Sequence, residues 1–535
     1  MSYQPKPPEH YKVIFQQDPS DLLMCAEMAE ITPEALLDYS VRLLAHLPID
    51  VYAPDANDAS GPNYRSKVTP PKLSAPGHYR NQQDVRVIDR FRALFDAGTD
   101  PLEILCHGAH AAGIDYMIRL RMNDLHDVVG LAFNIAKHSH RPTDPIGEPI
   151  YYTNQWKLDH PECLIGDPAD ATPPNTFSYW QRSAMNYALA PVRHYIFAMA
   201  QELVTGYDLD ILELDFIRFA FYFHRAEAYA QRHVLTELVR RIRKLCREEG
   251  GRRGRPVRLS ARVPDTLELG LRCGIDTAGW LSEGLLDMVI IGGGYADFAT
   301  PWRQITDVAR QAGVPAFACL NKAVTAGVAR VQHIRAAAHR AYAAGATGVK
   351  LWNCFYYFPY HNPKGTDPAG LEFVRELADP ATLRRREMTF AADAILDPDT
   401  FVGSAHFHQA WNGQVPMTIG LAADGIGQSV TFDIPEHAAG RQPSDEASLT
   451  AEIGNFWPHD DRLELYWNSR RLDNVQCELL RLHGRERHRL TCAIPCGSIR
   501  AGENLLELRL VHRDPRLDPF ISLWSAELTV PEMPS

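Results

Sequence analysis

The sequence contains no long apolar run. Nowhere in its 535 residues does it reach the roughly 20 consecutive apolar residues that a membrane-spanning helix needs. The segment from Met1 to Gln16 is polar and contains prolines, and it lacks the basic stretch followed by an apolar run that marks a signal peptide. We therefore expect a cytoplasmic protein that does not associate with membranes, although a secreted form whose signal has been removed fits the same sequence.

Cysteine and basic charge are also scarce. The ten cysteines are irregularly spaced and form no CxxC pair, which argues against a zinc ribbon and against a thioredoxin-type redox site. Lys and Arg together number 55 and Asp and Glu number 66, so the net charge is −11. Because phosphate binding needs a basic surface, an acidic chain of this size is a poor candidate for a general nucleic-acid binder.

The first part of the chain alternates short apolar runs with helical patterns. Apolar residues make up 45% of the chain and charged residues 23%, a composition typical of a globular protein with a large core. Thr32-Pro33 is typical of a helix start, with Thr as the cap and Pro in the first turn. Eight strands separated by helices predict an α/β fold, a parallel (β/α)8 TIM barrel. The expected strands are residues 11–15, 49–52, 114–120, 210–216, 257–263, 286–291, 314–320 and 348–355.

The pattern changes near residue 390. Helical periodicity gives way to short alternating runs separated by turn residues, which predicts an all-β sandwich. We therefore divide the chain into a barrel domain, residues 1–390, and a sandwich, residues 391–535, which we expect to be a carbohydrate-binding-like accessory domain. The expected sandwich strands are residues 417–421, 428–434, 462–467, 477–480, 505–511 and 520–528.

The fourth expected barrel strand carries two acids. Along it Leu212, Leu214 and Phe216 share one face, and Glu213 and Asp215 share the other. The apolar face must meet the surrounding helices, so the two carboxylates are expected to point into the barrel near its mouth. Barrel enzymes place their reacting groups at the C-terminal ends of strands, which makes this strand the first place to look for a site.

The neighbouring strands carry cationic side chains on the face that corresponds to the face of the two acids. Arg119, Arg121 and Asn123 share a face on the third strand, and Ser260 and Arg262 share a face on the fifth. Burying acids side by side is costly unless cations or a function offset it. Two interpretations follow: the charges form a catalytic centre, or paired charges simply fill the barrel interior.

Paired carboxylates at a barrel mouth fit glycoside hydrolysis, in which one acid protonates the leaving oxygen and the other attacks or activates water. Asp215, nearest the mouth, is the expected nucleophile or base. Glu213 and Asp124, which directly follows the third strand, compete for the role of partner acid. Asp265 and Asp297, after the fifth and sixth strands, are weaker candidates.

Further polar and aromatic residues lie near the expected strand ends. The long irregular stretch after the third strand has the length of a functional lid, and its aromatic residues could stack on sugars or pack the loop itself. The residues expected to bind or orient a substrate are Arg121, Asn123, His126, Arg218, Arg262, Tyr295, Asp55, Trp156 and Asn353.

Three motifs together resemble a known group of proteins. They are Arg121-Met122-Asn123-Asp124, the fourth-strand stretch Tyr207-Asp208-Leu209-Asp210-Ile211-Leu212-Glu213-Leu214-Asp215-Phe216-Ile217-Arg218, and Arg262-Val263-Pro264. The chain resembles the bacterial glycosyl-hydrolase-like barrel proteins called glycosyl-hydrolase-like family 10 or uncharacterised family 10 glycosylhydrolases. The resemblance implies a carbohydrate-active enzyme on a barrel followed by a sandwich. Family 18 chitinases carry a catalytic Glu where this chain has Ile217, which argues against a chitinase mechanism.

We therefore expect a glycoside hydrolase acting on an oligosaccharide, polysaccharide or glycoside, without a metal or organic cofactor. Its expected partner is the carbohydrate substrate, with neither nucleic acid nor membrane, and a homo-oligomer is compatible with the sequence. Two alternatives stay open: a non-catalytic carbohydrate-binding protein on a degenerate barrel, and another barrel enzyme such as a lyase or a metal-dependent hydrolase.

Overall fold

The structure is a computed structural model. It describes residues 3–25, 28, 30–70, 82–128, 154–167, 179, 181–293, 298–321, 323–324, 327–328, 331–352, 371–392, 414–422, 424–435, 441–482 and 485–533. Among these residues, no helix has the length and apolar character needed to cross a membrane.

Eight parallel strands close into a barrel in the order β1-β12-β9-β8-β7-β6-β5-β2. This confirms the TIM barrel and all eight expected strands. Their bounds are β1 Val13–Gln17, β2 Val51–Pro54, β5 Asp115–Arg121, β6 Ile211–Asp215, β7 Arg258–Val263, β8 Met288–Ile291, β9 Ala316–Asn321 and β12 Gly348–Trp352. Short hairpins add β3 Asn57–Asp58 with β4 Gly61–Pro62, and β10 Ala323–Val324 with β11 Gly327–Val328.

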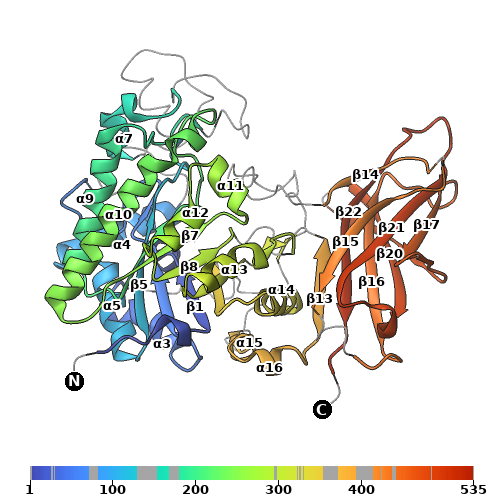
Figure 1. Cartoon of the computed structure of the whole chain (residues 1–535), viewed down its shortest axis with the longest axis horizontal. Helices are drawn as coiled ribbons and strands as arrows, with labels where there is room; N and C mark the ends of the chain where they lie inside the picture. Colours follow the sequence, from blue (N-terminus) through green and yellow to red (C-terminus); the bar gives the residue numbers. More distant parts are fainter. Residues whose placement is uncertain are drawn as a thin grey trace.

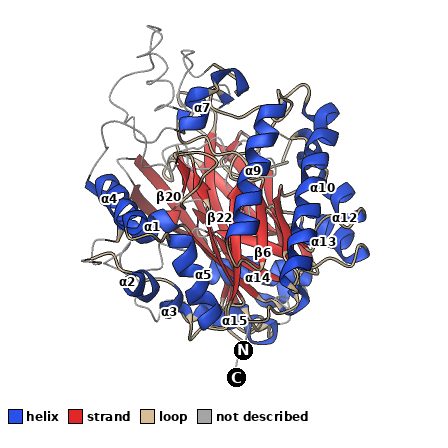
Figure 2. Ribbon diagram, turned by 90° about the vertical axis from the view of Figure 1, so that its left-hand side faces the viewer, coloured by secondary structure: helices blue, strands red, loops and turns tan. Residues whose placement is uncertain are grey.

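Helices surround the strands, as Figure 2 shows. The helix predicted at Thr32-Pro33 is present: the Thr32 side chain accepts a hydrogen bond from the backbone N–H of Ala35, at 3.0 Å, and so caps it. The helices are α1 Pro19–Met24, α2 Pro33–Asp38, α3 Val41–Leu44, α4 Gln82–Asp96, α5 Pro101–Ala111, α7 Gln155–Asp159, α9 Ala190–Gly206, α10 Ala228–Arg253, α11 Leu267–Arg272, α12 Thr277–Ser282, α13 Trp302–Gln311, α14 Val331–Ala343, α15 Phe373–Leu377 and α16 Pro380–Leu383.

Register places the charged side chains of three strands side by side. Arg119 of β5 pairs with Glu213 of β6, and two residues nearer the mouth Asp215 of β6 lies between Arg121 of β5 and Arg262 of β7. Because side chains alternate along a strand, these residues all face the barrel interior. Below them the interior is closed by an apolar layer that includes Ile14, Val51, Met117, Ile211 and Phe317.

Two antiparallel sheets form the C-terminal sandwich, beside the barrel in Figure 1. One sheet has the order β13-β22-β16-β20-β19, with β14 also paired to β22, and the other has the order β15-β21-β17-β18. Burial alternates along β22, as the sequence pattern predicts. The strands are β13 Met388–Ala392, β14 Met417–Ile419, β15 Gln428–Ile434, β16 Glu446–Gly454, β17 Arg462–Trp467, β18 Arg470–Arg471, β19 Gln476–Leu482, β20 Arg485–Pro495, β21 Gly502–His512 and β22 Ile521–Val530.

The barrel and the sandwich share one apolar core. Helix α14 packs on β13, and the ring of Phe298 lies 6.4 Å from the ring of Phe390. Polar contacts join the same surfaces: Nε2 of His333 lies 3.0 Å from Oε1 of Glu527, and Arg441 donates to the backbone carbonyl of Arg386 at 2.7 Å.

Candidate active site

Asp215 ends β6 at the C-terminal mouth of the barrel and has no exposed surface. Its Oδ1 accepts hydrogen bonds from the backbone N–H groups of Ile217, at 3.0 Å, and Arg218, at 3.2 Å, and lies 3.0 Å from Nε of Arg262. Its Oδ2 accepts a hydrogen bond from Arg119. Burial alone would raise the pKa of Asp215, but the charges of Arg262 and Arg119 outweigh it and hold that pKa below its usual range. Asp215 is therefore a carboxylate at neutral pH.

Glu213 lies two residues deeper on the same strand and is also fully buried. Nε of Arg119 donates to its Oε1 at 2.8 Å, and Nζ of Lys350 lies 2.6 Å from the same oxygen. Burial, together with the charge of Arg119, lowers the pKa of Lys350 to about 8. Glu213 thus lies between two cations below the mouth. This arrangement fits the interpretation in which paired charges fill the barrel interior.

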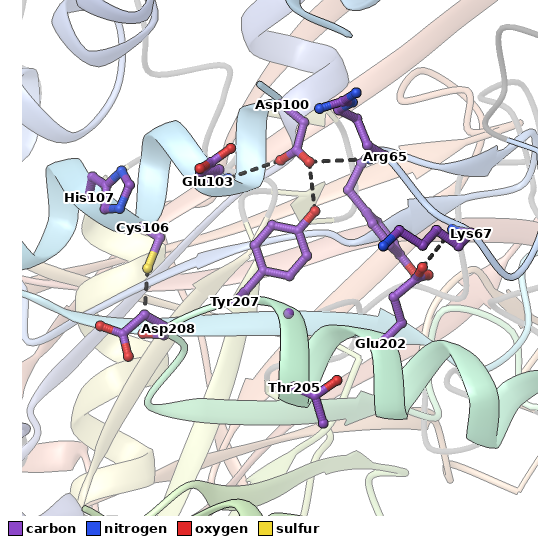
Figure 3. Close-up of a pocket in the computed structure, with 12 residues that line it drawn as sticks. Arg65, Lys67, Asp100, Glu103, Cys106, His107, Glu202, Thr205, Tyr207 and Asp208 are labelled. Atoms are coloured by element: carbon purple, nitrogen blue, oxygen red, sulfur yellow. Dashed lines mark hydrogen bonds between the residues drawn. The ribbon is translucent and has the colours of Figure 1, made fainter. Parts of the chain in front are cut away.

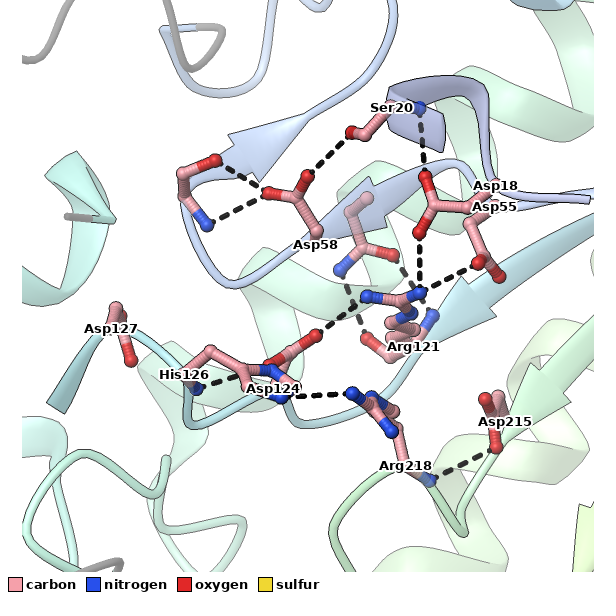
Figure 4. A network of polar contacts seen from close by, with 12 residues as sticks. Asp18, Ser20, Asp55, Asp58, Arg121, Asp124, His126, Asp127, Asp215 and Arg218 are labelled. Atoms are coloured by element: carbon pink, nitrogen blue, oxygen red, sulfur yellow. Dashed lines mark hydrogen bonds and ion pairs between the residues drawn. The ribbon is translucent and has the colours of Figure 1, made fainter. Parts of the chain in front are cut away.

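Arg121 donates hydrogen bonds to three carboxylates at the mouth (Figure 4). Its Nη2 donates to Asp18 and to Asp55, both at 2.7 Å, and its Nη1 donates to Asp124 at 2.8 Å. Asp55 also accepts from Arg119 and is fully buried. Asp55 and Arg121, which the sequence predicts to bind substrate, thus contact each other and further charged side chains of the mouth; their role in substrate binding stays a prediction.

Asp124, His126 and Arg218 form a chain that leads outward from Arg121. Nδ1 of His126 lies 2.5 Å from Oδ1 of Asp124, and Nε2 of His126 lies 2.8 Å from Nη2 of Arg218. Because a guanidinium can only donate, Nε2 accepts and the proton of the neutral imidazole is on Nδ1, facing Asp124. Burial lowers the pKa of His126, although Asp124 opposes this. The pKa of Asp124 is held well below its usual range despite burial, chiefly by His126 and Arg121.

Two other residues that the sequence predicts to bind substrate contact other parts of the chain, one at two loops and one between two helices. The Asn123 amide donates to the backbone carbonyls of Met185, at 3.3 Å, and Phe221, at 2.6 Å, and is fully buried. Trp156 of α7 stacks on Tyr195 with ring centroids 4.4 Å apart. In this arrangement Asn123 fixes the approach of two loops, and Trp156 packs its helix against α9.

Arg262 forms the wall of the mouth beside Asp215. Its guanidinium carbon lies 4.5 Å from the centroid of the Trp352 ring, and its Nη1 lies 3.8 Å from Sγ of Cys319. Its Nη2 is buried and has no hydrogen-bond partner within the part of the chain that the structure describes. Such a buried donor is costly and usually has a functional or structural reason.

Two buried acids near the mouth, Asp265 and Asp127, have a raised pKa. Burial raises the pKa of Asp265, which follows β7, to about 6, against the hydrogen bonds it receives from Thr300 and from the backbone of Gly293. Burial likewise raises the pKa of Asp127 to about 6, but that carboxylate lies 3.0 Å from Nζ of Lys157. The sequence gives Asp265 less weight than Glu213 and Asp124, because nothing in the local pattern shows how deeply Asp265 is buried.

Some expected features lie outside the described residues, namely Tyr295, Asn353 and Asp297. Within the described ranges, no three His, Cys, Asp or Glu side chains are grouped so that they could hold a metal ion.

A polar cavity of about 520 Å³ lies on the outer side of the barrel, between α5 and α9 (Figure 3). Its carboxylates are already bonded: Asp100 accepts from the Tyr207 hydroxyl at 2.6 Å, and Glu202 accepts from the Tyr64 hydroxyl at 2.9 Å. Burial raises the pKa of the Cys106 thiol in its wall, which keeps it protonated. None of the candidate residues of the barrel mouth lines this cavity.

The fold therefore defines a (β/α)8 barrel protein with a C-terminal β-sandwich, whose mouth carries a buried cluster of carboxylates and arginines. No protein-family model matches the chain, and no curated protein sequence matches it.

Similar solved structures include an α-L-fucosidase, isoenzyme 2, from Paenibacillus thiaminolyticus, with a TM-score of 0.40 and 13% identity over 71% of this chain and 51% of that one. The chain thus spans about half the length of that enzyme. The glycoside hydrolase domain of PgaB (BpsB) from Bordetella bronchiseptica has a TM-score of 0.40 and 9% identity over 68% of this chain and 98% of that one. An α-amylase from Lactobacillus plantarum has a TM-score of 0.40 and 10% identity over 91% of this chain and all (100%) of that one. Likenesses this distant carry no information about substrate or mechanism.

Proposed function

We propose that the protein is a glycoside hydrolase whose site lies at the C-terminal mouth of the barrel. The observation that carries the proposal is Asp215, a carboxylate at the end of the fourth barrel strand that two arginines keep ionised. An ionised carboxylate in this position suits attack on, or electrostatic stabilisation of, an oxocarbenium-like anomeric carbon. In this proposal Asp215 is the nucleophile or base.

In this proposal, some of the remaining residues of the mouth position Asp215, and others contact the substrate. Arg119 and Arg262 contact Asp215 directly and orient it. His126 and Arg218 are only partly buried, unlike Asp215, and are therefore the groups that a sugar would reach first. Imidazole and guanidinium groups can both hydrogen-bond sugar hydroxyls.

A panel of aryl glycosides and oligosaccharides tests the proposed activity on the full chain. Release of the aryl alcohol or of reducing sugar above the uncatalysed rate is the expected result. Absence of turnover across α- and β-linked pyranosides and furanosides would contradict it.

A non-catalytic carbohydrate-binding protein is the second candidate, and burial favours it. Asp215 and Glu213 have no exposed surface, and Asp265 exposes only 2%. Hydrolysis therefore requires Arg262 or its neighbours to move aside when substrate enters. A binding protein would need no such movement, and its ligand affinity would survive Asp215→Asn.

We further propose that the chain belongs with the family 10 glycosyl-hydrolase-like proteins, on the strength of the three motifs described above. The division at residues 390 and 391, and an accessory carbohydrate-binding role for the sandwich, are part of the same proposal. Sedimentation of the full chain with insoluble polysaccharides would test that role.

A further inference from the structure

Asp265 lies at the mouth of the barrel, just beyond the end of the strand next to that of Asp215. It follows β7, two residues after that strand ends at Val263. Because β6 and β7 are neighbouring parallel strands, their C-terminal ends lie at the same end of the barrel. Asp215 of β6 is opposite Arg262 of β7 in the register of the pair. Asp265 is thus in the segment that leaves the strand next to that of Asp215, three positions after Arg262 in the chain.

One oxygen of Asp265 is held and the other is not. Oδ1 accepts a hydrogen bond from the Thr300 hydroxyl at 2.9 Å, and Gly293 contributes a backbone hydrogen bond to the carboxyl group. Oδ2 is buried and has no hydrogen-bond partner among the residues that the structure describes. A buried carboxyl group with one unbonded oxygen is best stabilised by carrying a proton on that oxygen.

The backbone around Asp265 is shaped to admit the carboxyl group. Gly292, directly after β8, has φ of +87°, and a Cβ at that position would lie 2.7 Å from Oδ1 of Asp265. Glycine is thus needed there twice over, once for the backbone conformation and once for the close approach. Such a cradle indicates that the position of the carboxyl group is specified.

Arg262 links the two carboxyl groups and acts on them unequally. Its Nε lies 3.0 Å from Oδ1 of Asp215, whereas its charge lowers the pKa of Asp265 less than burial raises it. The pKa of Asp215 is accordingly lowered, and that of Asp265 is raised to about 6. Two carboxyl groups whose environments push their pKa values apart are the pattern that separates an acid from a nucleophile or base.

The other acids of the mouth are already paired with cations or with an imidazole. Glu213 is paired with Lys350 and Arg119, and Asp124 is paired with Arg121 and His126. Asp127 accepts a hydrogen bond from Nζ of Lys157 at 3.0 Å.

We propose that Asp265, rather than Glu213 or Asp124, is the proton donor of the site; this inference rests on the proposed glycosidase activity. The proton on Oδ2 passes to the glycosidic oxygen as the bond from that oxygen to the anomeric carbon breaks. The electron pair of that bond goes to the oxygen, which leaves as an alcohol. With Asp215 as nucleophile, a carboxylate oxygen of Asp215 forms the new bond to the anomeric carbon. Water then replaces Asp215 and returns a proton to Asp265, so that the enzyme is regenerated.

The test compares Asp265→Asn with wild type on two aryl glycosides of the sugar that wild type hydrolyses. One carries a dinitrophenyl leaving group, which departs without protonation, and the other a phenyl group, which needs it. We expect kcat/KM to fall by about 10²–10⁴-fold for the phenyl glycoside and by much less for the dinitrophenyl glycoside. Asp127→Asn, a matched change at a buried acid of similar pKa, should not alter the ratio between the two substrates. Equal losses on both substrates, or no loss, would overturn the inference.

A second variant covers the case in which Asp265→Asn does not fold. The Thr300 hydrogen bond lowers the pKa of Asp265, so Thr300→Val should raise it and move the alkaline limb of the pH profile of kcat/KM to higher pH. An unmoved limb would overturn the inference. The two failures are distinguishable: a wild-type protein without turnover on any glycoside contradicts the proposed function, and this inference with it. An active wild type with an unmoved limb contradicts the inference alone.

Discussion

Lys350 and Glu213 form an ion pair inside the barrel, with Nζ 2.6 Å from Oε1 and neither side chain exposed. The pair occupies the interior below the mouth, where Arg119 also contacts Glu213 at 2.8 Å. A buried pair of this kind holds the interior together only while both partners are present, because removing one leaves an uncompensated charge.

Glu213→Gln should therefore destabilise the fold by about 3–5 kcal/mol, because it leaves Lys350 and Arg119 buried without their carboxylate. Urea denaturation at neutral pH measures the effect. The residual activity per folded molecule should stay within a few-fold of wild type. A variant of wild-type stability whose turnover is lost would make Glu213 a catalytic group instead of a filler.

Asp265 should make stability fall with rising pH. Its pKa is about 6 in the folded chain and 3.8 for a free aspartate side chain, a difference that corresponds to roughly 3 kcal/mol. Below about pH 4 both states bind the proton, and between about 4 and 6 the folded state binds more, so the free energy of unfolding drops across that window. Asp265→Asn should remove this drop, so that its stability relative to wild type increases by about 3 kcal/mol from pH 4 to pH 7. Urea midpoints at several pH values measure this difference, and a difference independent of pH would show that Asp265 is not shifted.

His126 should be a neutral imidazole with its proton on Nδ1 at pH 7, because Nε2 accepts from Arg218. The ¹⁵N chemical shifts of the ring report the tautomer directly. The charge of Arg218 also lowers the pKa of His126, so Arg218→Met should raise that pKa. A proton found on Nε2 in the wild type, or a His126 pKa that falls in the variant, would contradict this arrangement.

Gly292→Ala should impair activity as well as stability, because the added Cβ would lie 2.7 Å from Oδ1 of Asp265. Gly313→Ala is the matched control: its φ of +68° imposes similar backbone strain, but no atom lies within 4 Å of the added carbon. Both variants should lose about 1 kcal/mol or more of stability, and only Gly292→Ala should lose turnover per folded molecule. Equal turnover in the two variants would show that the position of Asp265 does not matter.

Periodicity in the sequence was sufficient to predict the barrel. Strand alternation placed Glu213 and Asp215 inside, and the matching parity of Arg119 and Arg262 predicted the ion pairs that the structure contains. These are properties of single strands and their immediate neighbours, which local sequence determines.

Contacts between distant segments could not be predicted in this way. Asp18 and Asp55 meet Arg121 only because β1, β2 and β5 close on one another. The burial of Asp265 depends on Thr300, which lies 35 positions away in the chain. In the sandwich, the sequence pattern does not predict β13, β16, β18 or β20. Strand β20 begins with the charged run Arg485-Glu486-Arg487-His488-Arg489, and its place between two strands is set by tertiary pairing.

The participation of Asp215 in glycoside hydrolysis is tested most directly by kcat/KM of Asp215→Asn beside wild type on an aryl glycoside that wild type hydrolyses. Circular dichroism and urea denaturation establish the folded fraction, because the variant removes the charge that Arg119 and Arg262 share. We predict a loss of at least about a hundredfold in turnover per folded molecule. Turnover close to that of wild type would show instead that Asp215 serves only to pair the buried arginines.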